Sequence, residues 1–451
     1  MYLQSLSRQR GIGANSYLLD LDGTRLILDA GMHPKEEGLD SIPNYGQIEH
    51  DSIDGIVITH CHLDHIGSLP VAMRNYPRAR VYLTEPCGEL GDALLHNSVN
   101  VMTLKREELQ ITDYPFFTHR EVDRGQQVWQ YRDTDRTFTV GEEDETKCRF
   151  YDAGHIMGSV GVQIDHRGKR VFYTGDVNFE DQTLSIGASF PRDPVDVLIM
   201  ETTRGGVQRD AEYTRNRELE RVASVIKETM ARGGSVLIPI FAMGKTQEML
   251  MALYLMRKRR EIPASPIFIG GLSTKMTIIY DRFANLSSRN HRDFEILKEM
   301  ELTVASRRRK RDIRYSPCCI YALSSGMMTE KTVSNKFAHE FLDNPKNSLL
   351  FVGYADPESP AGKIRASNRG DMIHLDAESD PIALQCDVHE FDFSGHAIRE
   401  DLHQFAVDVN PKQVILVHGD DDAVEWFSDT LSMDLPNAEI VAAAPGEQTS
   451  F

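Results

Sequence analysis

The motif H-x-H-x-D-H at residues 60–65 constrains this chain more than any other feature of its sequence. It directly follows an apolar run at residues 55–59, which is typical of a buried strand. Imidazole and carboxylate groups together form the ligand set that zinc prefers in proteins. A buried cluster of imidazoles without a metal would leave polar groups unpaired. The motif therefore predicts a metal site in a loop at the end of a strand, with four candidate ligands: His60, His62, Asp64 and His65.

One loop cannot complete the coordination shells of two ions, so we expect further ligands where other predicted strands end. His155 lies between two predicted strands, and Asp176 closely follows another apolar run. His396 precedes a predicted helix. Asp29 closes a further apolar run and is suited to orient a ligand imidazole, although a turn-forming role explains it equally well.

The charge of the chain is unevenly distributed. The net charge of −18 argues at first against a nucleic-acid partner. Residues 205–345, however, hold 24 Lys and Arg against 16 Asp and Glu, a net charge of +8, which leaves −26 for the remainder. This asymmetry favours a basic module beside an acidic one, and a solvated basic surface is the alternative interpretation. The module contains a run of five basic residues: Arg307, Arg308, Arg309, Lys310 and Arg311.

Composition also bears on the cellular location. The chain has no run of eighteen apolar residues, so we expect no membrane-spanning helix and no membrane partner. The first 16 residues lack the apolar centre of a secretory signal. The six cysteines form no CxxC pair, which is typical of free thiols in a reducing cytoplasm. We therefore expect a cytoplasmic protein. The sequence does not decide its oligomeric state, and a homodimer is one alternative.

The order of predicted elements divides the chain into three segments. The first 200 residues contain short strands, several of them continuous apolar runs that are typical of strands buried on both faces. From about residue 205, helices and strands alternate, which predicts a separate parallel α/β unit. After about residue 346 the chain returns to further strands and helices.

Several motifs, taken in order, resemble those of one known family. Asp29, residues 60–65, His155 and Asp176 resemble the metal motifs of the metallo-β-lactamase superfamily. Other segments resemble its β-CASP group, which processes nucleic acids, and most of all bacterial short-form members and the catalytic core of eukaryotic pre-mRNA 3′-end endonucleases. These segments are motif A at residues 199–203 with Glu201, the start of the cap at 234–248, its closing loop at 324–328 with Ser325, motif C at 393–396 with His396, and the end of the hydrolase domain at 415–419 with His418.

The resemblance implies both a fold and a ligand set. The fold is an αββα sandwich, formed by residues 1–204 and 346–451, which an α/β β-CASP cap interrupts at residues 205–345. The resemblance implies a first zinc ion held by His60, His62, His155 and Asp176. It implies a second zinc ion held by Asp64, His65, Asp176 and His396, with Asp176 shared. Manganese is the alternative metal.

The implied activity is hydrolysis of RNA phosphodiester bonds. Two such ions activate a hydroxide for in-line attack on phosphorus and neutralise charge on the phosphate oxygens. Asp64 is expected to accept a proton as well as to bind metal. The basic cap is expected to contact RNA phosphates, and the run at residues 307–311 is a candidate part of that surface, with a solvated loop as the alternative.

One position departs from the pattern of the family. Motif B is a histidine that protonates the leaving oxygen, and the position that we match to it here is Lys363. Glu201 and Lys363 are then expected to face the leaving group, although a lysine donates a proton slowly unless its pKa is lowered. If this match is wrong, His418 is the next candidate for the acid.

Three other functions remain open. A small-molecule hydrolase of the same superfamily would keep the metal motifs but would not need a basic insertion of this size. A scaffold without activity would lack ligands, whereas here only the motif B histidine is absent. A DNA nuclease is less favoured, because the DNA-directed branch usually lacks the motif C histidine, and this argument rests on analogy.

The segment Gly244-Lys245-Thr246 ends like a phosphate-binding P-loop. Position 239 is proline, however, so the pattern G-x-x-x-x-G-K-T is not met. We expect the N-terminus of a helix in the cap, where free backbone amides can face a phosphate.

Overall fold

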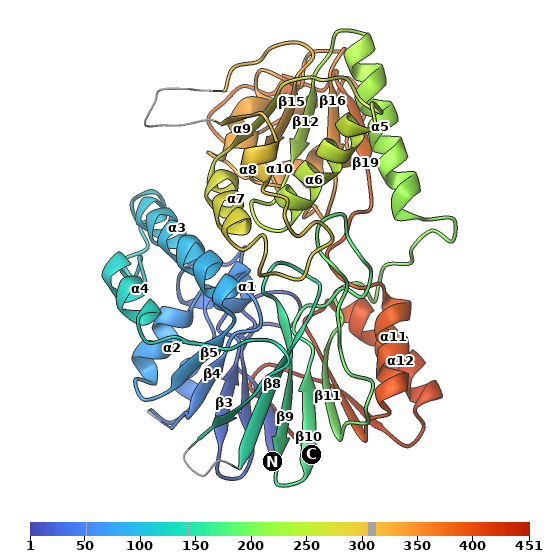
Figure 1. Cartoon of the computed structure of the whole chain (residues 1–451). Helices are drawn as coiled ribbons and strands as arrows, with labels where there is room; N and C mark the ends of the chain where they lie inside the picture. The colour runs from blue at the N-terminus through green and yellow to red at the C-terminus, as the bar shows by residue number, and fades with distance from the viewer. Residues whose placement is uncertain (51, 142–144, 305–312) are drawn as a thin grey trace. The chain divides into compact units, whose positions relative to one another are not determined.

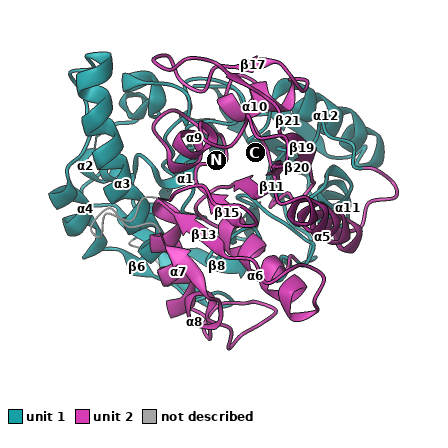
Figure 2. Ribbon diagram, turned by 90° about the horizontal axis from the view of Figure 1, so that it is seen from above, with its two compact units in different colours: residues 1–181, 186–209, 396–451 teal, residues 182–185, 210–395 magenta. Residues whose placement is uncertain are grey.

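The computed structural model describes residues 1–50, 52–141, 145–304 and 313–451. Contacts divide the chain into two compact units, which Figure 2 distinguishes by colour. The first unit comprises residues 1–181, 186–209 and 396–451, and the second comprises residues 182–185 and 210–395. No helix within the described residues is long and apolar enough to cross a membrane.

The first unit contains two seven-stranded sheets. In spatial order, one sheet consists of β22 (Gln448–Ser450), β1 (Tyr2–Ser5), β2 (Tyr17–Asp20), β3 (Arg25–Leu28), β4 (Gly55–Val57), β5 (Arg80–Leu83) and β6 (Gln130–Tyr131). The other consists of β21 (Glu439–Ala442), β20 (Gln413–Val417), β11 (Val197–Glu201), β10 (Lys169–Tyr173), β9 (Val160–His166), β8 (Thr146–Asp152) and β7 (Thr137–Val140). The first and last strands of the chain pair with each other, so both termini lie at one place in the first sheet (Figure 1).

Helices accompany the two sheets. The first group comprises α1 (Leu63–Ile66), α2 (Leu69–Asn75), α3 (Glu85–Leu109) and α4 (His119–Gln126), together with two short 3₁₀ helices, η1 (Gly38–Ser41) and η2 (Tyr45–Gln47). The second group comprises α11 (Arg399–Val409) and α12 (Asp421–Asp434). Figure 1 shows the two groups on opposite sides of the pair of sheets.

Strand β11 illustrates why the chain folds into these layers. Val197 and Ile199 are buried in a cluster that contains residues of both sheets, including Leu28 and Phe150. Leu198 and Met200 point to the other face and pack in a cluster with residues of α11 and α12. A strand covered on both faces must be apolar at every position, as this one is. The expected αββα sandwich is confirmed.

The second unit contains a six-stranded sheet in which every described pairing is parallel. Its spatial order is β14 (Leu302–Val304), β13 (Ile267–Gly270), β15 (Ile320–Leu323), β12 (Val236–Pro239), β16 (Ser348–Phe351) and β19 (Asp387–Glu390). Its remaining elements are β17 (Met372–Ile373), β18 (Ile382–Ala383), α5 (Arg215–Ala231), α6 (Lys245–Lys258), α7 (Leu272–Arg282), α8 (Ile296–Glu299), α9 (Val333–Ala338) and α10 (Pro360–Arg365). The predicted alternation of helix and strand corresponds to this sheet.

The boundary between the units differs from the one expected at residue 345. Strand β16 pairs with β12 and with β19, so the second unit extends to residue 395. A buried parallel strand is apolar whichever sheet it joins, and its sequence therefore does not reveal its partners. Over residues 210–395 the charges are 27 Lys and Arg against 25 Asp and Glu, so the basic excess belongs to part of the unit and not to the whole.

Candidate metal centre

The candidate ligands lie in loops at the carboxyl ends of strands in the first unit. Parallel neighbours such as β10, β11 and β20 end at one edge of their sheet, where α/β proteins commonly bind ligands. The resulting placements are Asp29 after β3, His60 and His62 after β4, His155 after β8, Asp176 after β10, Glu201 at the end of β11 and His418 after β20. Asp64 and His65 lie in the short helix α1.

Three imidazoles and one carboxylate form the first ligand group. The Nδ1 atom of His62 lies 3.1 Å from Nε2 of His60 and 3.1 Å from Nε2 of His155. The Oδ2 atom of Asp176 lies 3.5 Å from Nε2 of His60 and 3.7 Å from Nε2 of His155. Four ligands around a tetrahedral zinc ion, each about 2.0–2.1 Å from it, stand about 3.3 Å apart. The arrangement therefore fits one zinc ion.

Asp176 also faces a second group through its other oxygen. Its Oδ1 atom lies 3.3 Å from Nε2 of His65 and 3.2 Å from Nδ1 of His418. This oxygen is buried and accepts no hydrogen bond within the described part of the chain. Gly175 allows this placement, because its φ is +52° and a Cβ there would lie 2.8 Å from Cβ of Thr59. A buried carboxylate oxygen without a donor fits a position next to a cation.

The second group consists of Asp64, His65 and His418. The Oδ2 atom of Asp64 lies 3.3 Å from Nε2 of His418 and 3.9 Å from Nε2 of His65. The sequence assigned His396 to this place, but the structure groups His396 with Asp176 and Glu201 instead. His418 is grouped with Asp64 and His65 instead. It directly follows β20, and the strand order β20, β11, β10 brings the loop after β20 close to Asp176, which follows β10.

Asp29 fixes the orientation of His65. Its Oδ2 atom lies 2.8 Å from Nδ1 of His65 and accepts a hydrogen bond of 2.8 Å from the hydroxyl of Tyr173. Its Oδ1 atom accepts a hydrogen bond of 2.7 Å from the backbone amide of Thr59. Because Nδ1 of His65 donates to this carboxylate, Nε2 is the ring atom that faces Asp64 and Asp176. Asp29 therefore lies beside His65, and its supporting role towards a metal ligand stays a prediction.

The protonation states of most of these groups suit a metal ion. Burial lowers the pKa of His60 well below its ordinary value and that of His62 to about 4, so both rings are neutral. Burial alone would raise the pKa of Asp64, but the neighbouring His65 and His418 lower it to about 2. His65 differs, because Asp176 and Asp29 raise its pKa despite the opposing effect of burial. A metal ion must therefore displace a proton from His65.

Glu201 and His396 form a separate pair beside these groups. The Nδ1 atom of His396 lies 3.2 Å from Oε2 of Glu201 and 4.0 Å from Oδ2 of Asp176. Glu201 is buried and also accepts a hydrogen bond of 2.7 Å from the amide of Val177. Burial lowers the pKa of His396, but Glu201 outweighs this effect and the pKa is raised. The pair therefore favours an imidazole that carries a proton.

Three other predicted features belong to the second unit or lie outside the described residues. Ser325 and Lys363 belong to the second unit, where the Ser325 hydroxyl lies 3.1 Å from that of Thr329 and Lys363 is exposed on α10. Their roles towards the residues of the first unit stay predictions. The basic run at residues 307–311 lies outside the described residues.

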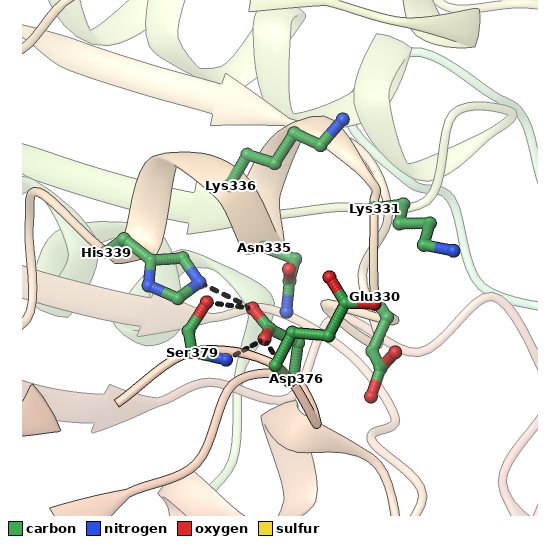
Figure 3. Close-up of a pocket in the computed structure, with 8 residues that line it drawn as sticks. Glu330, Lys331, Asn335, Lys336, His339, Asp376 and Ser379 are labelled. Atoms are coloured by element: carbon green, nitrogen blue, oxygen red, sulfur yellow. Dashed lines mark hydrogen bonds and ion pairs between the residues drawn. The ribbon is translucent and has the colours of Figure 1, made fainter. Parts of the chain in front are cut away.

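The second unit also contains a pocket of about 310 Å³. Figure 3 shows the carboxylate of Asp376 between His339 and Ser379, at 2.9 Å from His339 Nε2 and 3.0 Å from the Ser379 hydroxyl. In a nucleophile–base pair the serine would donate to the histidine, whereas here both groups donate to the same carboxylate. The arrangement therefore does not activate Ser379 as a nucleophile.

Comparisons with known proteins agree with this architecture. Three family models match successive parts of the chain: the metallo-beta-lactamase superfamily at residues 10–210, the Beta-Casp domain at residues 246–364, and the Zn-dependent metallo-hydrolase RNA specificity domain at residues 381–443. A crystal structure of a protein of unknown function from Enterococcus faecalis V583 covers 100% of this chain and 99% of its own, with a TM-score of 0.57 and 11% identity. That likeness concerns the fold alone.

Two longer eukaryotic proteins are similar in sequence. The endoribonuclease YSH1 of Candida glabrata is 26% identical over 427 residues, which cover 92% of this chain and 54% of that protein. The cleavage and polyadenylation specificity factor 73 of Drosophila melanogaster is 27% identical over 429 residues, which cover 93% of this chain and 60% of that protein. The chain thus spans little more than half the length of these relatives. From its matching domains, its sandwich fold and its histidine–aspartate groups, the chain belongs to the metallo-β-lactamase superfamily and, within it, to the β-CASP group of metal-dependent hydrolases.

Proposed function

We propose that the chain is a ribonuclease that hydrolyses phosphodiester bonds with two zinc ions. One observation carries the proposal: Asp176 turns one oxygen towards three histidines and the other towards a second set of ligands. A carboxylate in this position suits a pair of ions about 3.5–4 Å apart, which is the spacing of two-metal phosphodiesterases.

The residues of the first unit divide into two ligand sets around the shared Asp176. The first set is His60, His62, His155 and Asp176. The second is Asp64, His65 and His418, to which we add Asp176 because its Oδ1 atom faces His65 and His418. Bound zinc ions would supply an activated water and neutralise charge on the oxygens of the phosphate. Asp29 holds the His65 ring in the orientation that binding needs.

His396 is the best candidate to protonate the leaving oxygen. Its Nδ1 atom lies 3.2 Å from the Glu201 carboxylate, which raises the pKa of the ring and so favours its protonated form. An imidazole held in this way is a better donor near neutral pH than an exposed lysine. We therefore propose that His396, and not Lys363, protonates the leaving oxygen. We propose that Lys363 contacts the RNA instead.

Two observations support RNA as the substrate. One of the matching family models describes an RNA specificity domain, and a similar protein is named an endoribonuclease. The run of five basic residues at 307–311 can contact phosphates without reading sequence.

The proposal is tested by incubating the purified chain with RNA labelled at the 5′ end or the 3′ end, matched DNA, and a p-nitrophenyl phosphodiester. We expect internal cleavage of RNA that stops with a chelator and returns with zinc. Cleavage of DNA alone, or of the small ester alone, would contradict the choice of RNA. A protein that is fully active without a transition metal would contradict the metal centre.

Replacing Asp29 by asparagine is expected to weaken zinc binding by about 10–100-fold, because an amide orients the His65 ring less firmly than a carboxylate does. The affinity is measured by competition with a chromogenic chelator. Asp20→Asn is a matched control, because Asp20 is a partly buried residue at the end of β2 whose carboxylate pairs with Arg25. Equal zinc affinities for Asp29→Asn and the control would contradict the role of Asp29.

Neutralising the basic run at residues 307–311 is expected to weaken RNA binding and to reduce its dependence on salt, because fewer counterions are released. Affinity is measured between about 50 and 200 mM salt, the range in which a protein with several phosphate contacts loses orders of magnitude. An unchanged affinity and an unchanged salt slope would exclude this run from the RNA surface.

A further inference from the structure

The first turn of α6 contains two charged residues, Lys245 and Glu248, that the proposed chemistry does not use. Both belong to the segment at residues 234–248 that resembles the start of the β-CASP cap, and Lys245 also lies in its P-loop-like part, Gly244-Lys245-Thr246. Gly244 precedes the helix with a φ of +75°, and no side chain caps its first amide groups. Both residues make hydrogen bonds with groups of their own unit.

Lys245 holds the segment that leads to His396. Its ammonium group donates a hydrogen bond to the backbone carbonyl of Phe393. The Phe393 ring is buried, and the guanidinium of Arg215 lies 5.2 Å from its centre. The neighbouring Asp392 is held as well, because its carbonyl accepts a hydrogen bond of 2.8 Å from the hydroxyl of Tyr213. Charge-assisted hydrogen bonds of this kind are about twice as strong as neutral ones.

Glu248 holds a second segment, which follows Asp176 in the chain. Its carboxylate accepts hydrogen bonds from the backbone amides of Leu184, at 2.8 Å, and Ser185, at 2.7 Å. Arg215 lies 3.5 Å from the same carboxylate and donates a hydrogen bond of 2.9 Å to the hydroxyl of Thr183. Residues 182–185 and Phe393 are therefore fastened to the same turn of α6, with Arg215 in contact with both.

We infer that Lys245 is a positioning residue for His396, and this inference rests on the proposed function. Phe393 precedes His396 by only three residues, so the bond from Lys245 fixes the backbone that carries the imidazole. Displacement of a reacting group by about 1 Å can cost about 100-fold in rate. The alternative is that Lys245 binds an RNA phosphate at the N-terminus of α6.

The inference is tested with Lys245→Met, with Lys245→Arg as the conservative variant and Lys258→Met as the matched control. Lys258 is an exposed residue at the other end of the same helix. We expect Lys245→Met to lower kcat for RNA by about 10–100-fold with little change in KM. Lys245→Arg should recover most of the loss, because it keeps a charged donor, and Lys258→Met should match the wild type.

Two further measurements separate positioning from folding and from phosphate binding. A p-nitrophenyl phosphodiester has a good leaving group that needs no acid, so Lys245→Met should hydrolyse it at nearly the wild-type rate and retain its zinc. In the His396→Ala background, Lys245→Met should cause no additional loss with RNA, because both changes remove the same effect.

A raised KM with an unchanged kcat would overturn the inference in favour of a phosphate contact. Additive losses in the double variant, or an equal loss with the p-nitrophenyl ester, would overturn it in favour of a general structural role. Wild-type protein that cleaves no RNA would contradict the proposed function itself, and this outcome is read from the wild type alone.

Discussion

Replacement of Asp176 by asparagine is expected to lower kcat for RNA hydrolysis by at least about 10³-fold and to reduce the bound zinc from the proposed two ions to one or none. The reason is that each ion contributes several kcal/mol of charge stabilisation in the transition state, and Asp176 is the one residue that both ligand sets share. The loss is measured by single-turnover kinetics, with elemental analysis of the same sample.

Asp429→Asn is the matched control for this prediction, because Asp429 is an exposed aspartate on α12 of the same unit. The control should keep both ions and full activity. If Asp176→Asn binds two zinc ions with wild-type affinity, Asp176 is not the shared ligand, and the grouping of the histidines needs another explanation.

Replacement of His396 by alanine is expected to lower kcat for RNA by about 10²–10⁴-fold while both proposed zinc ions stay bound, since the loss of a general acid has an effect of this size. The loss is expected to be small with a p-nitrophenyl phosphodiester. Lys363→Ala, which removes the acid that the sequence alone suggested, is expected to raise KM and to leave kcat nearly unchanged.

The same pair of variants distinguishes the two assignments of His396. Loss of one zinc ion from His396→Ala would restore His396 as the metal ligand that the resemblance implied. A large fall of kcat in Lys363→Ala, with KM unchanged, would return the donor role to Lys363.

Much of the candidate site was predictable because its signal is local. The motif at residues 60–65 contains two candidate ligands for each set within one loop, and its preference for a metal ion can be predicted without knowledge of the fold. Asp176 also has a local signal, because it closely follows an apolar strand. The αββα sandwich was expected from the resemblance of the motifs, and strands buried on both faces fit it.

The part that the sequence could not supply depends on contacts between distant residues. His396 and His418 both lie in loops of the carboxyl-terminal segment, and sequence alone does not say which of them reaches Asp64. That choice depends on the spatial order β20, β11, β10, which brings the loop after β20 close to Asp176. His418 did carry a detectable signal, because it directly follows an apolar strand.

Contacts place the end of the second unit at residue 395 and not at the expected residue 345, for a related reason. Strand β16 has the apolar sequence of any buried strand, and only its pairing with β12 assigns it to the second unit. The basic excess between residues 205 and 345 was therefore counted over part of a unit whose full charge is nearly balanced. The basic run at residues 307–311, and not the charge of the whole unit, therefore supports an RNA-binding surface.

If two zinc ions share Asp176, anomalous X-ray diffraction at the zinc edge from crystals of the wild-type protein will locate both. We predict two peaks about 3.5–4 Å apart. One should lie among His60, His62 and His155, the other among Asp64, His65 and His418, and both should contact Asp176. A single peak, or a second peak between Glu201 and His396, would contradict the account.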